Sequence, residues 1–268
     1  MWHIKTHKSN LYLAGSIHAL NRDFYPFANA YAKAFDSVDN LVVEINIAAL
    51  DPLKTKAKIE ALTWLEGDQS LAGLFAEQDE AALLEMIQTR GLTKQALLKM
   101  RPWVLLEMIT AQQLAQTNFK ANLGVDQFFI KRAQEQTKNI LELETLDEQI
   151  NGINGAPLRA QVAAISLALS QLNEGQQQLN QLAGFWQRAD AEGLYQYAQE
   201  DMLAFPEIKP LMKSLIDDRN QTMAEKVAKL IESGGSYFVM VGALHLAGPN
   251  SVQNQLIKQG YSLEKVSP

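Results

Sequence analysis

Apolar residues form six short runs along the chain, and the pattern predicts that each is a β-strand. The runs over 10–17 (NLYLAGSI) and 236–243 (SYFVMVGA) are apolar on both faces, which is typical of buried strands in parallel sheets. The run over 39–47 (DNLVVEINI) is similar but contains Glu44. The other three lie over 2–6, 138–145 and 261–266, and the alternation in the last one predicts an edge strand.

Most of the remaining chain has the periodicity of amphipathic helices. The clearest case is 27–38, where one face carries Phe27, Ala30, Tyr31, Ala34, Phe35 and Val38. We expect further helices over 79–90, 93–100, 102–116, 157–173 and 250–260, and a long one over 206–235 that is broken at Pro210. The glutamine-rich stretch 170–182 is predicted to join two helices through a polar turn at Gly175.

The order of these elements predicts a helix-rich α/β fold in a single domain over 1–268. Strand, helix and strand open the chain and also close it, so residues 1–50 and 233–268 are expected to form a central sheet that is mixed and partly parallel. Residues 51–232 are then a large helical insertion that contains the strand near 138–144.

Composition narrows the class of protein. The chain is 47% hydrophobic and 20% charged, as in an ordinary globular protein. A net charge of -6 argues against binding to nucleic acid through general phosphate attraction. The absence of cysteine excludes disulfides, thiol catalysis and thiolate metal sites. No apolar run approaches the ~20 residues that a membrane-spanning helix needs, so we expect no transmembrane segment.

The first ten residues, MWHIKTHKSN, lack the apolar core of a signal peptide. A chain from which such a peptide had been removed would look the same, so both a periplasmic or cell-envelope location and a cytoplasmic one fit. Acidic helical surfaces that contain Met and Leu leave a homodimer open.

Two of the predicted strands end in the same motif, G-x-x-H, at Gly15 to His18 and at Gly242 to His245. We expect each glycine to turn the chain off its strand, and each histidine to point into the crevice at the carboxyl ends of parallel strands, where ligands bind. One such motif is a weak signal, because histidines at strand ends are usually structural. The repetition is a stronger signal.

The other two of the four histidines, His3 and His7, lie in a polar stretch and are expected at the surface.

Glu44 lies near the end of its predicted strand and supplies a carboxylate close to the two motifs. A buried carboxylate is costly unless it is paired or bound to a metal, so Glu44 is either a ligand or the partner of Arg22 or Arg219. Two imidazoles and a carboxylate form the ligand set of many hydrolytic metal sites and leave a position open for water. A divalent cation can lower the pKa of that water to about 7.

With these motifs together, the chain resembles the TraB/GumN family over nearly its whole length. The resemblance rests on YLAGSIHALNRDFYP, LVVEIN, MRPWVLLEMI, GVDQFF, LELETLDEQI, DDRNQTMAEKV and YFVMVGALHLAGPNSVQNQLIKQGYSLEKV. Animal relatives of this family are the Tiki-type membrane-anchored metalloproteases. More remotely, it is similar to erythromycin esterases and to a group of haem-binding lipoproteins. Ser16 is a small departure, because the family usually has threonine there.

The resemblance implies a metal-dependent hydrolase site in which His18, Glu44 and His245 hold a divalent cation such as Mn²⁺, Co²⁺ or Zn²⁺. The family's LET segment falls on Glu144, which we expect to act as a general base or to orient the metal ligands. An alternative is that Glu144 caps a helix or lies at the surface.

The family's Arg-Asn pair falls on Arg219 and Asn220. Arg219 is expected to stabilise an oxyanion or to bind a substrate carboxylate, and the alternative is a salt bridge to Glu44 or Asp218. Asn220 is expected to orient a histidine or the substrate.

The leading hypothesis is therefore metal-assisted hydrolysis of a peptide or related amide bond. A second hypothesis is a binding protein without catalysis, which captures a small ligand such as haem through a histidine. A third is a metal-independent esterase-type hydrolase in which His18 or His245 acts as the base.

Overall fold

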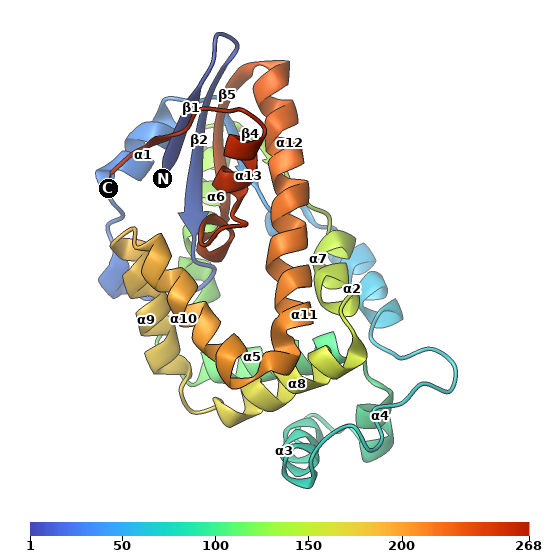
Figure 1. The fold of residues 1–268 in the computed structure, drawn as a ribbon. Helices are drawn as coiled ribbons and strands as arrows, with labels where there is room; N and C mark the ends of the chain where they lie inside the picture. The colour runs from blue at the N-terminus through green and yellow to red at the C-terminus, as the bar shows by residue number, and fades with distance from the viewer. Residues whose placement is uncertain (268) are drawn as a thin grey trace.

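Figure 1 shows the fold of the computed structural model, which describes residues 1–267. These residues contain one sheet whose strands lie in the order β4-β3-β5-β2-β1-β6. The bounds of the strands are β1 Trp2–Lys5, β2 Ser9–Ser16, β3 Asn40–Val43, β4 Asn139–Glu142, β5 Gly235–Gly242 and β6 Glu264–Lys265. All six predicted strands are confirmed, and so is a helix-rich α/β fold whose sheet is built mainly from the two ends of the chain.

Four neighbouring strands of the sheet, β4, β3, β5 and β2, are parallel. β1 runs antiparallel to both β2 and β6, which makes the sheet mixed. The pairing of β2 with β5 runs from Ser9 opposite Gly235 to Ser16 opposite Gly242. The strands that lead into the two G-x-x-H motifs are therefore direct neighbours and end level with each other.

Helices cover both faces of the sheet, because the side chains of the buried strands alternate between two apolar clusters. One face packs against α12 (Arg219–Ser233) and α13 (Val252–Lys258) through residues that include Leu11, Leu13, Val239 and Val241. The other face packs against α1 (Asn29–Asp36), α6 (Val125–Glu135) and α9 (Gly175–Gln187) through residues that include Ala14, Leu41, Phe238 and Met240.

The middle of the chain forms the helical part that lies beyond one end of the sheet (Figure 1). Its helices are α2 (Pro52–Ala61), α3 (Glu77–Gln88), α4 (Lys94–Lys99), α5 (Pro102–Ala115), α7 (Leu146–Asn154), α8 (Leu158–Ser170), α10 (Ala191–Ala204) and α11 (Lys209–Met212). An apolar cluster of its own, which includes Leu83, Leu97, Leu105 and Ile165, joins α3, α4, α5 and α8. Throughout residues 1–267, the helices are too short or too polar to cross a bilayer.

Two local predictions about helix ends were wrong. Pro210 does not break the long helix, because it lies in the first turn of α11, where its missing N–H is not needed. The helix instead continues through a π-helical segment, η5 (Lys213–Asp218), into α12. The polar turn that joins α8 to α9 is present but lies just before Gly175, which is the first residue of α9 and packs against Gln113 of α5.

Candidate functional site

The predicted site residues gather at the carboxyl edge of the parallel strands. His18 follows β2, Glu44 follows β3, and Glu144 comes two residues after β4. His245 lies in a 3-10 turn, η6 (Ala243–Leu246), directly after β5. Parallel strands end at one edge of a sheet, so segments more than 200 residues apart in sequence meet there.

Arg219, the first residue of α12, joins the two carboxylates of the site. Its Nη2 donates to Oε2 of Glu44 at 2.8 Å and to Oε2 of Glu144 at 2.5 Å, and its Nε donates to Oε1 of Glu144 at 2.9 Å. Burial alone would lower the pKa of Arg219, but the two carboxylates outweigh it and raise that pKa above its usual value. The salt bridge to Glu44, which was the alternative role of Arg219, is therefore present, whereas Asp218 pairs with Lys213.

Glu44 is the centre of the cluster and is only 7% exposed. Its Oε1 accepts the backbone N–H of Gly242 at 2.6 Å, and its Oε2 accepts from Arg219 and, at 3.5 Å, from Nε2 of Gln149. Burial alone would raise the pKa of Glu44, but the neighbouring histidines, Arg219 and the Gly242 N–H hold it below its usual value. Glu44 is therefore an ionised carboxylate with a fixed orientation.

His245 is buried, and its tautomer follows from its neighbours. Nδ1 lies 2.7 Å from Oδ1 of Asn220, whose Nδ2 donates to the carbonyl of Asn250 at 3.0 Å and so fixes the amide. The proton is therefore on Nδ1. Burial lowers the pKa of His245 to about 4, so the ring is neutral at pH 7. Its Nε2 carries a lone pair and lies 3.8 Å from Oε1 of Glu44.

His18 is the exposed member of the cluster, with 66% of its side chain accessible. Its Nδ1 lies 3.4 Å from Oδ2 of Asp126 on α6, and this interaction raises the pKa of His18. The other side of the ring is turned toward Gly242. A Cβ atom on Gly242 would lie 3.3 Å from Oε1 of Glu44, 3.5 Å from Nε2 of His18 and 3.6 Å from Cδ2 of His245. Three polar side chains thus surround Gly242.

The two motif glycines do not act as turns. Both lie inside their strands, neither has a positive φ, and Gly242 has φ -51° and ψ 138°. Their role is close approach, because a Cβ atom on Gly15 would lie 3.2 Å from Cα of Ala243. On Gly242 it would extend into the space that the three polar side chains surround.

The end of β2 is held by two further hydrogen bonds. Tyr31 Oη and Trp186 Nε1 both donate to the carbonyl of Gly15, at 2.9 and 2.8 Å. Burial raises the pKa of Tyr31 to about 12, so its hydroxyl keeps the proton that it donates. The strand that leads to His18 therefore ends at a fixed position.

The donor atoms of the cluster decide whether the predicted metal fits this site. Within residues 1–267, no three His, Asp or Glu side chains are grouped closely enough to coordinate one ion as they stand. The chemistry of the donor set fits a divalent cation, because Nε2 of His18, Oε1 of Glu44 and the ring of His245 surround Gly242, and Nε2 of His245 lies 3.8 Å from that carboxylate oxygen. A metal held by His18, Glu44 and His245 stays a prediction.

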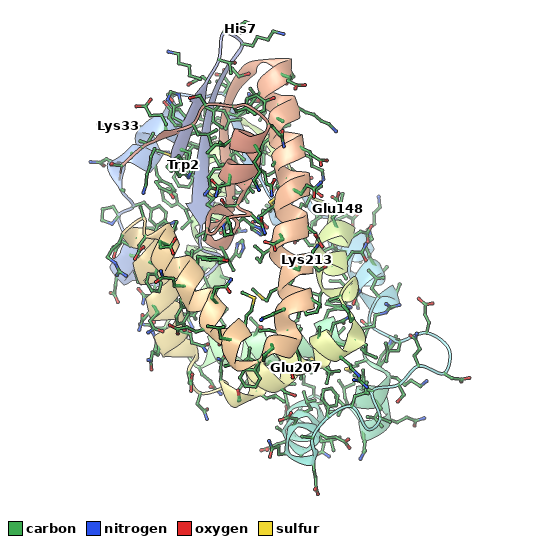
Figure 2. The ribbon with its side chains drawn as sticks, in the orientation of Figure 1. Trp2, His7, Lys33, Glu148, Glu207 and Lys213 are labelled. Atoms are coloured by element: carbon green, nitrogen blue, oxygen red, sulfur yellow. The ribbon has the colours of Figure 1, made fainter. Side chains whose placement is uncertain are left out.

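A cavity of about 200 Å³ lies beside the turn that carries His245. It is enclosed by α10, by α11 with η5, and by the loop after His245. Apolar side chains that line it are Met202, Met212, Ile216 and Leu244, and Lys209 and Lys213 also reach it. Figure 2 labels Lys213 where α11 passes into α12.

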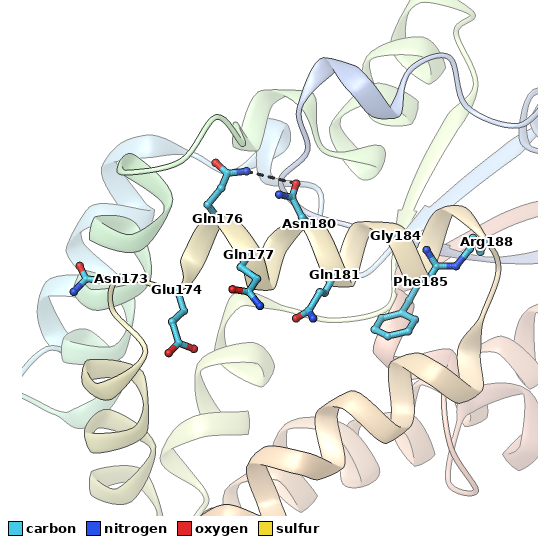
Figure 3. A pocket seen from close by; sticks show the side chains of 9 residues that line it. All are labelled: Asn173, Glu174, Gln176, Gln177, Asn180, Gln181, Gly184, Phe185 and Arg188. Atoms are coloured by element: carbon cyan, nitrogen blue, oxygen red, sulfur yellow. Dashed lines mark hydrogen bonds between the residues drawn. The ribbon is translucent and has the colours of Figure 1, made fainter.

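A larger cavity, about 710 Å³, lies along α9 and the turn before it and contains none of the site residues. Figure 3 shows its amide side chains, with Gln176 bonded to Asn180 and Gln177 and Gln181 projecting from the helix.

The remaining histidines lie outside the cluster. His7 is exposed in the turn between β1 and β2, at the far end of the sheet from the helical part (Figure 2). His3 is half-buried rather than at the surface, because it stacks on Tyr12 and bonds Asn10 at 2.7 Å.

Three contributors to the cluster were not expected from the sequence: Asp126 behind His18, Gln149 beside Glu44, and the carbonyl of Asn250. The only signal for Asp126 was its place in GVDQFF, an acid in the first turn of a helix that follows a glycine. A backbone carbonyl carries no sequence signal at all.

The fold and the cluster define an α/β protein with a charged, histidine-containing site at the carboxyl edge of its parallel strands. The family model described as the TraB/PrgY/gumN family matches residues 1–265, and the chain belongs to this family. It is 24% identical over 250 residues to the uncharacterized protein YbaP of Escherichia coli (strain K12), which covers 92% of this chain and 88% of that protein. It is also 24% identical over 248 residues to YbaP of Shigella flexneri, with 91% and 87% covered. No solved structure matches the chain.

Proposed function

We propose that the protein is a metal-dependent hydrolase that cleaves a peptide or related amide bond beside Gly242. One observation carries the proposal. The lone pair of His245 Nε2 and the ionised Oε1 of Glu44 lie 3.8 Å apart, and Nε2 of His18 is turned toward the same point. Acceptors brought together in this way favour a cation among them, and nitrogen and oxygen donors suit Mn²⁺, Co²⁺ and Zn²⁺ alike.

Each residue of the cluster has a role in this proposal. A cation held by His18, Glu44 and His245 would supply a water molecule of lowered pKa and polarise the substrate carbonyl. Asn220 fixes the His245 tautomer so that Nε2 faces the site. Arg219 keeps Glu44 ionised and oriented.

Glu144 is better suited to positioning than to proton transfer. Both of its oxygens accept from Arg219, and it is 4% exposed. A general base needs an oxygen within reach of the proton that it takes, whereas these oxygens hold the guanidinium in place.

The substrate in this proposal has an apolar side chain next to the bond that is cleaved. The cavity beside His245 is lined mainly by apolar groups, and its two methionines adapt to different shapes. Its volume of about 200 Å³ equals that of roughly six or seven water molecules, which is room for one large side chain.

The test combines metal analysis of the purified protein with a peptide-library cleavage screen with and without Mn²⁺, Co²⁺ or Zn²⁺. We expect cleavage that a chelator stops and added metal restores. His18→Ala and His245→Ala should each abolish metal binding in calorimetric titration while the fold is retained. His3→Ala is the matched control, because His3 lies on β1 outside the cluster. Unchanged metal affinity in both site variants would remove the proposal.

A second candidate is metal-independent hydrolysis with His18 as the base. The observation that favours it is Asp126 behind Nδ1 of His18, the arrangement in which a carboxylate orients a basic imidazole. Cleavage that resists chelators but is lost in His18→Ala would select this mechanism over the first.

A further inference from the structure

We propose that Asp126 is a positioning residue of the site, which holds the proton of His18 on Nδ1 and so directs Nε2 toward Gly242. The inference rests on the proposed function in one respect, namely that His18 acts through Nε2. Asp126 lies in the first turn of α6, far from both G-x-x-H motifs in the sequence.

The loop that carries His18 is fastened to the segment that leads into α6. Leu20 and Lys120 exchange backbone hydrogen bonds in both directions, at 3.3 and 2.8 Å, and Val125 N–H donates to the carbonyl of Ile17 at 2.9 Å. Three backbone bonds on the two sides of His18 leave little freedom for the residue between them. The position of α6 therefore sets the position of His18.

Gly124 makes this close contact possible. A Cβ atom on Gly124 would lie 2.3 Å from the carbonyl oxygen of His18 and 2.7 Å from its carbonyl carbon, which is closer than such atoms can approach. The φ of Gly124 is -60°, so the glycine is required for space and not for an unusual backbone conformation. This approach brings Asp126 within reach of the imidazole.

The side chain of Asp126 is placed for His18 and satisfies little else. Its Oδ2 lies 3.4 Å from Nδ1 of His18, and the side chain is 16% exposed. Its Oδ1 is buried without a hydrogen-bond partner among residues 1–267. A carboxylate in the first turn of α6 interacts favourably with the helix dipole, but leaving Oδ1 buried without a partner costs stability, so the dipole alone does not account for this placement.

The other histidine gives an independent parallel. His245 also has an oxygen acceptor at Nδ1, from Asn220 on α12, and its Nε2 also faces the site. Two histidines from different loops thus receive the same orientation from two different helices. The partner of the buried ring is a neutral amide, and that of the exposed ring is a carboxylate.

The test is the tautomer of the neutral His18 ring, read from long-range ¹H–¹⁵N correlation spectra at increasing pH until the ring signals stop changing, because Asp126 raises the pKa of His18 above that of an ordinary histidine. The chain has only four histidines, so a His18→Gln sample identifies the His18 ring signals. We expect Nδ1–H in the wild type and in Asp126→Asn, whose amide oxygen still accepts. Asp126→Leu should shift His18 toward Nε2–H. Asp36→Asn is the control, because Asp36 pairs with Arg132, which lies on α6 like Asp126 but away from the site.

An Nε2–H tautomer in the wild type would overturn the proposal, and that result needs no variant to fold. So would an unchanged tautomer in Asp126→Leu. Calorimetry with Zn²⁺ and Mn²⁺ gives a second readout, in which Asp126→Leu should lose about 10- to 100-fold in affinity and Asp36→Asn none. If the wild type shows Nδ1–H at His18 but binds neither ion, the metal-dependent function fails while the positioning role of Asp126 stands.

Discussion

The two G-x-x-H loops leave neighbouring strands at the same level, yet they place their histidines in opposite surroundings. The side chain of His245 is 6% exposed and that of His18 is 66% exposed. Asn220 on α12 holds the first, and Asp126 on α6 lies behind the second. A repeated motif therefore fixes where a side chain leaves the sheet, while the helices packed around it decide its charge and its access to solvent.

The two halves of the site therefore differ in rigidity and in access to solvent. The buried half of the site, with His245, Glu44 and Arg219, is a rigid hydrogen-bonded network. The exposed half, with His18, is open to solvent. Four experiments on six variants test this comparison, from the largest expected effect to the smallest.

Arg219→Met should be the most damaging substitution, because it leaves Glu44 and Glu144 as buried carboxylates without their cation. Breaking a buried ion pair by removing one partner costs about 3–5 kcal/mol of unfolding free energy. Urea unfolding measures the loss. The control is Arg132→Met, which removes a half-exposed pair with Asp36 and should cost about 1 kcal/mol or less. Equal small losses in both variants would contradict a rigid buried half.

Gly124→Ala should damage the exposed half through the backbone. The new Cβ atom would collide with the carbonyl of His18, and the loop must move, at a cost of about 1–3 kcal/mol. Gly242→Ala should cost less stability, because its contacts are 3.3 Å or longer, but more metal affinity, because the methyl group enters the centre of the cluster. Thermal unfolding and calorimetry on both variants measure the two effects. Parallel losses in both measurements would show that the two glycines do not play separate roles.

His245→Ala and His18→Ala should separate stability from function. Without His245, the buried Oδ1 of Asn220 loses its donor, which costs about 1–3 kcal/mol. Without the exposed His18, stability should change by about 0.5 kcal/mol or less. Metal binding should be lost in both. Denaturant midpoints of the two variants, measured under the same conditions, compare the losses of stability. An equal loss in both variants would mean that solvent exposure does not distinguish the two G-x-x-H loops.

Glu148→Gln should have the smallest effect on the free energy of unfolding, and this effect should depend on pH. Glu148 lies in the first turn of α7, and its pKa is lowered by Lys226 and by the backbone N–H of Thr145. Because the pKa of Glu148 is lower in the folded state than in the unfolded state, the ionised carboxylate stabilises the fold at pH values above the unfolded-state pKa. This stabilisation is lost as the pH falls through the folded-state pKa. At 43% exposure we expect a loss of about 1 kcal/mol or less near pH 7.

That small difference should vanish in acid. Urea unfolding of the wild type and the variant near pH 7 and near pH 3 compares the two conditions. A loss that persisted in acid would assign the effect to packing and not to charge.

Much of this arrangement was predictable from the sequence. Apolar runs located all six strands, and parallel strands that end at one edge predicted that Glu44, His18 and His245 meet. The sequence did not show that β5 lies between β2 and β3, because strand order depends on how helices pack on the sheet. The continuous helix at Pro210 and its π-helical segment depend on local hydrogen bonding that periodicity does not resolve.

The role of the motif glycines was misjudged for a related reason. A glycine after an apolar run suggests a turn. The need for space comes instead from Ala243 at Gly15, and from Glu44 and His18 at Gly242, and these neighbours are distant in sequence from the glycine that they approach. The same holds for Asp126, whose partner His18 lies about a hundred residues earlier. Contacts of this kind are fixed by tertiary packing and leave no periodic trace.

The position of β5 also affects how the chain can fold while it is being synthesised on the ribosome. β2 is made first but gains its parallel neighbour only when residues 235–242 emerge, and until then one of its edges is open. Glu44 likewise gains Arg219 and the Gly242 N–H only after about 175 and 198 further residues have been made. A growing chain therefore carries a sheet with an open edge until β5 has been made, and the cluster around Glu44 is complete only after Gly242 has been added.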